Sequence, residues 1–267
     1  MKNSLRRIAL IADMHVGSKY ALFPDEYEDR EGNVYKGNRG QRQLYEYWQA
    51  FAKKCDELKV DTVFADGDIL HGTNRKEFGR NLMFSDLEVQ KDVAELLLRQ
   101  IVKDRRFYTL TGSGYHESLD SRVHKELAHR LGGKFLGMMA NSRLKPSKRI
   151  MNIAHGVGGA AIYTTQILNR ESDFILQAEG LDQLPFHIDI MVRAHLHRFI
   201  HIHLEKLHLI QLPCWSMWEP NKIYVKYYGK KMPNIGGVIL IIDDQDRIHV
   251  WHFTYPLPHI ADYLREV

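Results

Sequence analysis

Long apolar runs are what this 267-residue sequence has least of. No stretch approaches the roughly 18 to 20 apolar residues of a membrane span, so we expect no membrane partner. The apolar run near the N-terminus, Ile8 to Ala12, ends at Asp13 and is too short for the hydrophobic region of a signal peptide. An all-apolar run of this length is typical of a central strand that is covered on both faces.

Cysteine is also scarce. Cys55 and Cys214 form neither a disulfide framework nor a zinc-like pair, which favours a reduced, cytoplasmic setting. There is no internal repeat, low-complexity tract or linker, and the sequence therefore predicts a single domain over residues 1–267. The formal charge of +4 is compatible with a polyanionic substrate, although many proteins with no nucleic-acid role have a similar charge.

Histidine is plentiful, and several of the 15 histidines stand where an apolar strand ends. The strand ends are Asp13-Met14-His15, Gly67-Asp68, Gly114-Tyr115-His116, His155-Gly156 and His195-Leu196-His197. In α/β sheets ligands bind at the carboxyl ends of strands, so we expect these side chains to converge. Alone, each motif is weak, because a D-x-H pair is equally a turn aspartate with an exposed histidine. Their order along the chain makes the pattern specific.

Two carboxylates and four imidazoles form the candidate metal site: Asp13, His15, Asp68, His155, His195 and His197. This donor set suits manganese, iron or zinc better than magnesium, which prefers oxygen ligands. Two such ions about 3.5 to 4 Å apart clamp the attacking and leaving oxygens of a phosphoryl displacement and lower the pKa of a bridging water toward 7.

The rest of the chain predicts alternating helices and strands. Helical spacing covers Arg42 to Leu58, and Ser85 with Glu88 predicts a capping box for a helix over Asp86 to Val102. The polar segment 18–40 is long for a connection, and we interpret it as a lid beside the site. We interpret His124 and His129 as surface residues of a helix, and His201 and His203 as outward-facing strand residues.

These ordered motifs resemble the calcineurin-like metallophosphoesterase superfamily, from Asp13 to His197. The resemblance implies an α/β four-layer sandwich of two mixed β-sheets flanked by helices. It implies that Asp13, His15 and His197 hold one divalent ion together with Asp68. Asp68 then bridges to a second ion, held by His155 and His195. Manganese is the expected metal, with iron or zinc as alternatives. His116 matches the histidine that protonates the leaving group or steadies the phosphoryl charge.

The third motif departs from the family pattern G-N-H-D or G-N-H-E. Here Tyr115 stands where the family has the asparagine that gives the second metal an amide oxygen. Ser113 or a water fills that coordination place, or the Tyr115 phenolate does, which a ferric ion would favour. We favour Ser113 or water, and expect weaker binding of the second metal. The other departure, Ala194 for the glycine of G-H-x-H, is mild.

Asp13-Met14-His15-Val16-Gly17 and Gly67-Asp68-Ile69-Leu70-His71 look most like the DNA-repair exonuclease branch of the superfamily. That likeness implies that His71 supports the metal ligands or positions the substrate, so we count it with His116 among the catalytic candidates. The alternative is a histidine at a helix start or in a turn. Lys222, Tyr224 and Lys226 belong to a strip of alternating basic and aromatic residues. Such a strip binds phosphates and stacks bases, or else guards the edge of an exposed strand.

The sequence therefore favours a dinuclear-metal phosphodiesterase, with a nuclease acting on DNA or RNA as the first hypothesis. The second hypothesis is a phosphatase or phosphodiesterase for a small molecule, nucleotide or phosphoprotein. The third is a non-catalytic binding module on a decayed site, which only the missing asparagine supports. The oligomeric state stays open.

Overall fold

The computed structural model describes residues 6–73, 78–116, 122–156, 165–218 and 232–258. Its larger sheet has the strand order β13-β12-β1-β4-β5-β6. In chain order these strands are β1 (Arg6–Ile11), β4 (Thr62–Asp66), β5 (Arg106–Leu110), β6 (Lys134–Phe135), β12 (Ile235–Ile242) and β13 (Ile248–Tyr255). β1, β4, β5 and β6 run parallel, whereas β12 pairs antiparallel with both β1 and β13.

The second sheet has the order β10-β11-β9-β8-β7. Its strands are β7 (Met139–Arg143), β8 (Ile150–Ala154), β9 (Ile190–Arg193), β10 (Ile200–His203) and β11 (His208–Gln211). The three inner strands are parallel to one another, and both edge strands are antiparallel. A separate hairpin joins β2 (Glu26–Glu28) to β3 (Val34–Lys36).

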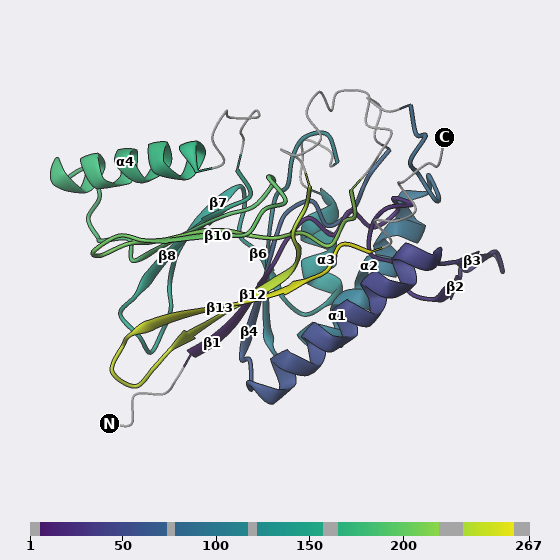
Figure 1. The fold of residues 1–267 in the computed structure, drawn as a ribbon, viewed down its shortest axis with the longest axis horizontal. Coiled ribbons are helices and arrows are strands. Elements are labelled where there is room, and N and C mark those ends of the chain that lie inside the picture. The colour runs from purple at the N-terminus through teal and green to yellow at the C-terminus, as the bar shows by residue number, and fades with distance from the viewer. Residues whose placement is uncertain (1–5, 74–77, 117–121, 157–164, 219–231, 259–267) are drawn as a thin grey trace, which may run out of the picture.

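Helices cover the outer face of each sheet. α1 (Arg39–Glu57), α2 (Leu87–Val102) and α3 (Arg122–Arg130) pack on the larger sheet, and α4 (Gln166–Gly180) packs on the second sheet, on the opposite side of the molecule (Figure 1). The expected α/β arrangement of two mixed sheets flanked by helices is confirmed.

Three apolar cores separate these four layers. One lies between α1, α2 and the larger sheet, one between the two sheets, and one between α4 and the second sheet. The two faces of β1 pack in different cores, which explains why its sequence is apolar throughout. Ile8 and Leu10 face the core between the sheets, whereas Ala9 and Ile11 face the helices. A strand with both faces covered cannot alternate apolar with polar residues.

The two long helices on the larger sheet are capped by their own sequence. Asn38 caps α1, and its side chain accepts a hydrogen bond from the Gln41 N–H while the Gln41 side chain accepts one from the Asn38 N–H. At α2 the cap is Asp86, which accepts from the Glu88 N–H. The prediction of a Ser85 capping box was wrong, because an aspartate one residue later caps the helix equally well.

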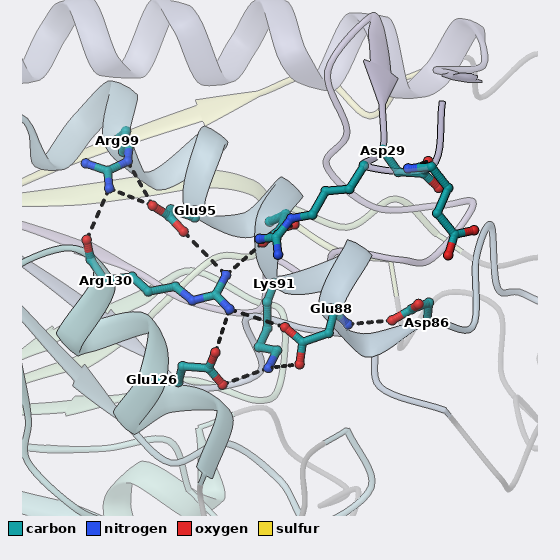
Figure 2. A network of polar contacts seen from close by, with 11 residues as sticks. Asp29, Asp86, Glu88, Lys91, Glu95, Arg99, Glu126 and Arg130 are labelled. Carbon is teal, nitrogen blue, oxygen red and sulfur yellow. Dashed lines mark hydrogen bonds and ion pairs between the residues drawn. The ribbon is translucent and has the colours of Figure 1, made fainter. Parts of the chain in front are cut away.

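Ion pairs tie α2 to α3 (Figure 2). The Arg130 guanidinium lies 2.7 Å from Asp92 and 2.5 Å from Glu126, and also contacts Glu88 and Glu95. Lys91 adds contacts to Glu88 and Glu126. The carboxylates raise the pKa of Lys91 although burial opposes its charge. One arginine thus neutralises a group of acids that would otherwise repel one another.

The segment predicted to be a lid is partly ordered by its own β2–β3 hairpin. Arg30 within it lies 2.9 Å from Asp92 of α2, and the Asn38 amide at its end donates to the Lys19 carbonyl. Whether it closes over the site stays a prediction. Among the helices that the structure describes, none combines the length and apolarity needed to cross a bilayer.

The packing of α2 yields a matched pair of substitutions. Leu97 is fully buried against the larger sheet, whereas its neighbour Leu96 is 39% exposed. We expect Leu97→Ala to lower the free energy of unfolding by about 2 to 5 kcal/mol, because it leaves a cavity in the core. Leu96→Ala loses the same atoms from the surface and should cost less than about 1 kcal/mol. Denaturant unfolding measures both, and equal losses would contradict this packing.

Candidate metal centre

The predicted ligands come from loops at the carboxyl ends of parallel strands in both sheets. Asp13 and His15 follow β1, Asp68 follows β4, His155 follows β8, and His195 and His197 follow β9. The structure brings these six side chains together as two groups of three. One group is Asp13, His15 and His197, and the other is Asp68, His155 and His195. This is the division that the resemblance implies, although the metals themselves stay a prediction.

Short distances define each group. In the first, Nε2 of His15 and Nε2 of His197 are 3.1 Å apart, and Asp13 Oδ1 lies 3.2 Å from His197 Nε2. In the second, Asp68 Oδ2 lies 3.0 Å from His155 Nε2 and 4.0 Å from His195 Nδ1. Donor atoms at such separations can share one small cation.

Asp13 lies between the two groups. Its Oδ1 is 3.7 Å from His15 Nε2 in one group and 3.7 Å from His155 Nε2 in the other. The resemblance gave the bridging role to Asp68, whose contacts with histidine ligands are with His155 and His195 of its own group. The carboxylate that touches both groups here is Asp13, and a bridge by Asp68 stays a prediction.

The residues present fit a cation. Asp13 Oδ1 and His155 Nε2 are buried, and although each lies close to an ionisable neighbour, neither makes a well-directed hydrogen bond to a described residue. Leaving such atoms unpaired costs free energy, whereas a divalent ion would accept lone pairs from both. A mixed set of carboxylate oxygens and imidazole nitrogens is also the chemistry that zinc, manganese and iron bind.

Backbone strain concentrates at these ligands. Five of them have left-handed backbone conformations, which side chains rarely adopt. The φ values are 51° at Asp13, 46° at His15, 47° at Asp68, 71° at His195 and 55° at His197. Such residues cost free energy of order 1 to 3 kcal/mol each and persist where the surrounding structure enforces them. The loops are therefore shaped to aim these side chains, at a cost to the stability of the fold.

Gly67 makes room for His155. A Cβ at position 67 would lie 2.6 Å from Nδ1 of His155 and 2.6 Å from the Gly112 Cα. The same Nδ1 donates a hydrogen bond to the Asp66 carbonyl at 2.6 Å. This bond fixes the tautomer of the ring and leaves Nε2 as the nitrogen that faces Asp68.

Burial and charge compete strongly in the site. Burial favours neutral Asp13, but His197 and His155 outweigh it and hold the pKa of this carboxyl well below its ordinary value. The same competition, with His155 as the main partner, lowers the pKa of Asp68. Burial opposes the charge of His155, yet Asp68 and Asp13 raise its pKa well above the ordinary value. His155 and the two carboxylates therefore favour one another's charged forms.

The pKa values of the two histidines in the first group are shifted in opposite directions. Burial, followed by the neighbouring His116, lowers the pKa of His15 to about 3. Burial also opposes the charge of His197, but Cys214 and Asp13 raise its pKa to about 10. His15 is thus a neutral imidazole at neutral pH, which is the form that binds a metal.

The two predicted catalytic histidines lie beside the first group. His71, His116 and His15 bring one ring nitrogen each within 4.8 Å of one another, and the His15 and His116 ring centroids are 4.4 Å apart. The half-buried His116 donates from Nδ1 to the His71 carbonyl at 2.9 Å. That bond leaves Nε2 of His116 available to a substrate.

A glutamine from α2 holds the loops that carry these histidines. The buried Gln90 amide accepts from the Gly72 N–H at 2.9 Å and donates to the Gly72 carbonyl at 3.1 Å. The Gln90 side chain also packs against Gly17, where a Cβ would come within 2.5 Å of it. Gly72 in turn lies against the His116 carbonyl, 2.3 Å from where its Cβ would be. Gln90 therefore links the loops after β1, β4 and β5.

The third motif places a serine against Asp68. The Ser113 N–H donates to Asp68 Oδ1 at 2.6 Å and the Ser113 hydroxyl to Asp68 Oδ2 at 3.0 Å. Tyr115 is 55% exposed. The structure thus puts Ser113 at the second group. The predicted substrate residues Lys222, Tyr224 and Lys226 lie outside the described residues.

Four further residues near the site were not singled out by the sequence patterns. Besides Gln90, these are Asp66, Cys214 and His124. Asp66, the last residue of β4, is fully buried, and burial raises its pKa to about 7. Cys214 is one of the groups that raise the pKa of His197. The spacing Asp66-Gly67-Asp68 could have indicated a second carboxylate, but no sequence signal marked Gln90 or Cys214.

The burial of His124 shows that its predicted surface position was wrong. It was expected on the surface of its helix, yet it is fully buried. Burial lowers its pKa, and Asp68 and His155 have smaller, opposite effects on it. His129 on the same helix is exposed, as predicted.

Comparison with known proteins finds similarity only among solved structures. No protein-family model and no curated protein matches the chain. Similar structures include a predicted phosphoesterase of Streptococcus pneumoniae, with 11% identity, a TM-score of 0.39, and 94% of this chain and 99% of that chain covered. Zinc-bound Vps29 of Entamoeba histolytica has 12% identity and a TM-score of 0.44, with coverage of 93% and 98%.

The Escherichia coli phosphoesterase Yfce is similar at the same level, with 11% identity, a TM-score of 0.43, and coverage of 92% and 98%.

Burial of His124 predicts a specific pH dependence. Burial lowers its folded pKa to about 3, whereas the unfolded value is near 6.5. Below pH 6.5 the unfolded chain binds a proton that the folded chain excludes, so stability falls as pH falls toward 3. We expect wild type to lose on the order of 1 kcal/mol per pH unit more than His124→Leu over this window.

Denaturant unfolding at pH 6.5 and pH 5 measures the difference in slope. His129→Leu provides the matched removal of an exposed imidazole from the same helix. Identical pH dependence in wild type and His124→Leu would show that His124 is not kept neutral by the fold.

Proposed function

We propose that this protein is a metal-dependent phosphoesterase that hydrolyses phosphodiesters. The observation that carries the proposal is the pair of ligand groups, in which buried carboxylates and imidazoles from four loops converge around Asp13. Two divalent ions bound there would supply positive charge to the phosphoryl oxygens and lower the pKa of a water. Six converging donors exceed what one structural ion needs.

His116 is the residue we assign to proton transfer. Its Nδ1 is committed to the His71 carbonyl, and its ring lies 4.4 Å from that of His15, at the rim of the first group. A protonated Nε2 at this place would donate to the leaving oxygen or to a phosphoryl oxygen. His71 would act through its carbonyl, which fixes the orientation of the His116 ring.

Ser113 is the residue we place at the position of the missing asparagine. Its hydroxyl already contacts Asp68, and the exposure of Tyr115 argues against a buried phenolate ligand. A neutral hydroxyl is a weaker metal ligand than a carboxylate or an imidazole. The second group should therefore bind its ion less tightly than the first.

Nucleic acid is the diester that we propose first. The likeness of the first two motifs to DNA-repair exonucleases and the formal charge of +4 support it. A small diester, a nucleotide or a phosphoprotein is the alternative, and the same assay separates them.

Asp68→Asn tests the metal mechanism. In the presence of manganese we expect wild type to cleave bis-p-nitrophenyl phosphate and DNA, and the variant to lose about 100-fold or more of this activity, because a carboxylate ligand is removed. Asp104→Asn makes the same change at an exposed position and should leave the activity intact. The panel includes p-nitrophenyl phosphate and single- and double-stranded DNA.

Each arm has an outcome that contradicts a part of the proposal. Cleavage of the monoester alone would exclude a nuclease, equal activity in Asp68→Asn would exclude the metal mechanism, and failure of wild type to bind metal would favour a non-catalytic module.

Gln90→Leu tests the positioning of His116. Loss of the Gln90 contacts with Gly72 should loosen the His71 carbonyl and hence the His116 ring. We expect diesters with poor leaving groups to lose about 10-fold or more in kcat, and diesters of p-nitrophenol to lose much less, as for His116→Ala.

The matched control is Gln100→Leu on the same helix, whose amide donates to the Tyr45 hydroxyl instead. An equal loss for good and poor leaving groups, together with loss of bound metal, would show that Gln90 only holds the fold.

A further inference from the structure

Three histidines form a further group beside the ligands of the proposed metal centre. His15, His71 and His116 follow β1, β4 and β5, and each brings one ring nitrogen within 4.8 Å of the other two. His15 also belongs to the first ligand group, whereas His71 and His116 are additional donors. The donors of this group are all imidazole nitrogens, while each of the two ligand groups includes a carboxylate.

The rings are spaced as three ligands of one ion would be. With metal–nitrogen bonds of about 2.0 to 2.1 Å, imidazole rings at tetrahedral angles have centroids about 5 Å apart. The observed centroid distances are 4.4 Å between His15 and His116, 5.0 Å between His71 and His116, and 5.8 Å between His15 and His71. Small turns of the side chains therefore suffice to bring three nitrogens onto a shared ion.

Hydrogen bonds hold these histidines in place before any ion binds. His116 Nδ1 is bound to the His71 carbonyl at 2.9 Å, so Nε2 is the nitrogen that can offer a lone pair. The His71 N–H donates to the Val16 carbonyl at 2.8 Å, which fixes His71 beside the loop that carries His15. His15 and His71 are at most 4% exposed, and the half-buried His116 gives access from solvent. Ligands that are already held lose little freedom when they bind.

We propose that His15, His71 and His116 form an inhibitory site for one Zn²⁺ ion, with water as the fourth ligand. Three imidazoles and a water make up a tetrahedral zinc shell. Manganese binds such nitrogen donors less tightly than zinc does, and carboxylate oxygen suits it better. Manganese therefore stays with the ligand groups that contain Asp13 and Asp68, and zinc fills the all-imidazole group.

The inhibitory effect rests on the function proposed above, whereas the zinc site itself does not. A neutral imidazole has one lone pair, so His15 cannot serve this ion and the first ligand group at the same time. Zinc on Nε2 of His116 also occupies the nitrogen that we assign to proton transfer. An ion at this site therefore removes a ligand of the metal centre and the proton donor together.

Nitrogen NMR of the histidine rings tests the site without any assay of activity. The sample is the metal-free, full-length protein with isotope-labelled histidine, titrated with Zn²⁺ to saturation. We expect the ring nitrogens of His71 and His116 to shift in wild type and also in Asp13→Asn, which weakens the first ligand group but keeps all three imidazoles. If the rings of His71 and His116 do not respond in either protein, zinc binds elsewhere and the proposal is wrong.

Zinc inhibition of the manganese-loaded enzyme is the second readout. At saturating manganese, we expect half-inhibition of His71→Gln to need about 10-fold more zinc or higher than in wild type, because an imidazole ligand is lost. Each protein is compared with its own activity without zinc. His129→Gln removes an exposed imidazole and should be inhibited like wild type.

The two readouts separate failure of this site from failure of the proposed function. Equal inhibition of wild type and His71→Gln would overturn the inhibitory site, because zinc would then act by replacing manganese. A wild type without manganese-dependent activity would contradict the proposed function, and the NMR response of His71 and His116 would still decide whether the zinc site exists.

Discussion

The rest of this structure depends on two carboxylates that are buried among imidazoles. Asp13 and Asp68 are at most 1% exposed, and an ionised carboxyl in such a place is unstable unless positive charge lies against it. Histidines on the neighbouring loops supply that charge when no metal is bound, and a divalent ion would replace it. The site is therefore built so that some cation is always needed.

That requirement explains the four-layer architecture. Asp13 and Asp68 belong to the larger sheet, whereas His155, His195 and His197 belong to the second. The apolar core between the sheets fixes the distance between these two halves, and only their correct spacing brings His155 Nε2 to 3.0 Å from Asp68. Helices then cover both outer faces, which leaves the strand ends as the open side. Left-handed backbone at five ligands is the local cost of the convergence.

Much of the fold and site followed from local patterns. Strands such as β1 were recognisable because both faces are covered and the sequence is apolar throughout, and motifs such as Asp13-Met14-His15 stood out because they follow such strands. The α2 cap was misassigned to Ser85, since Asp86 beside it has the same capability. His124 was misplaced on the surface, because one polar residue does not reveal which side of a helix is buried. Gln90 had no local signal, since the Gly72 backbone that it holds is 18 residues away.

By itself, the sequence determined which side chains could take part in the site, because their chemistry and their position after strands are written in the order of residues. It also determined the α/β class, through the alternation of apolar strands and amphipathic helices. Only the tertiary structure decided that Asp13 rather than Asp68 contacts both groups of ligands, and that Ser113 lies against Asp68. These are distances between loops of different strands and sheets, and packing between layers sets them.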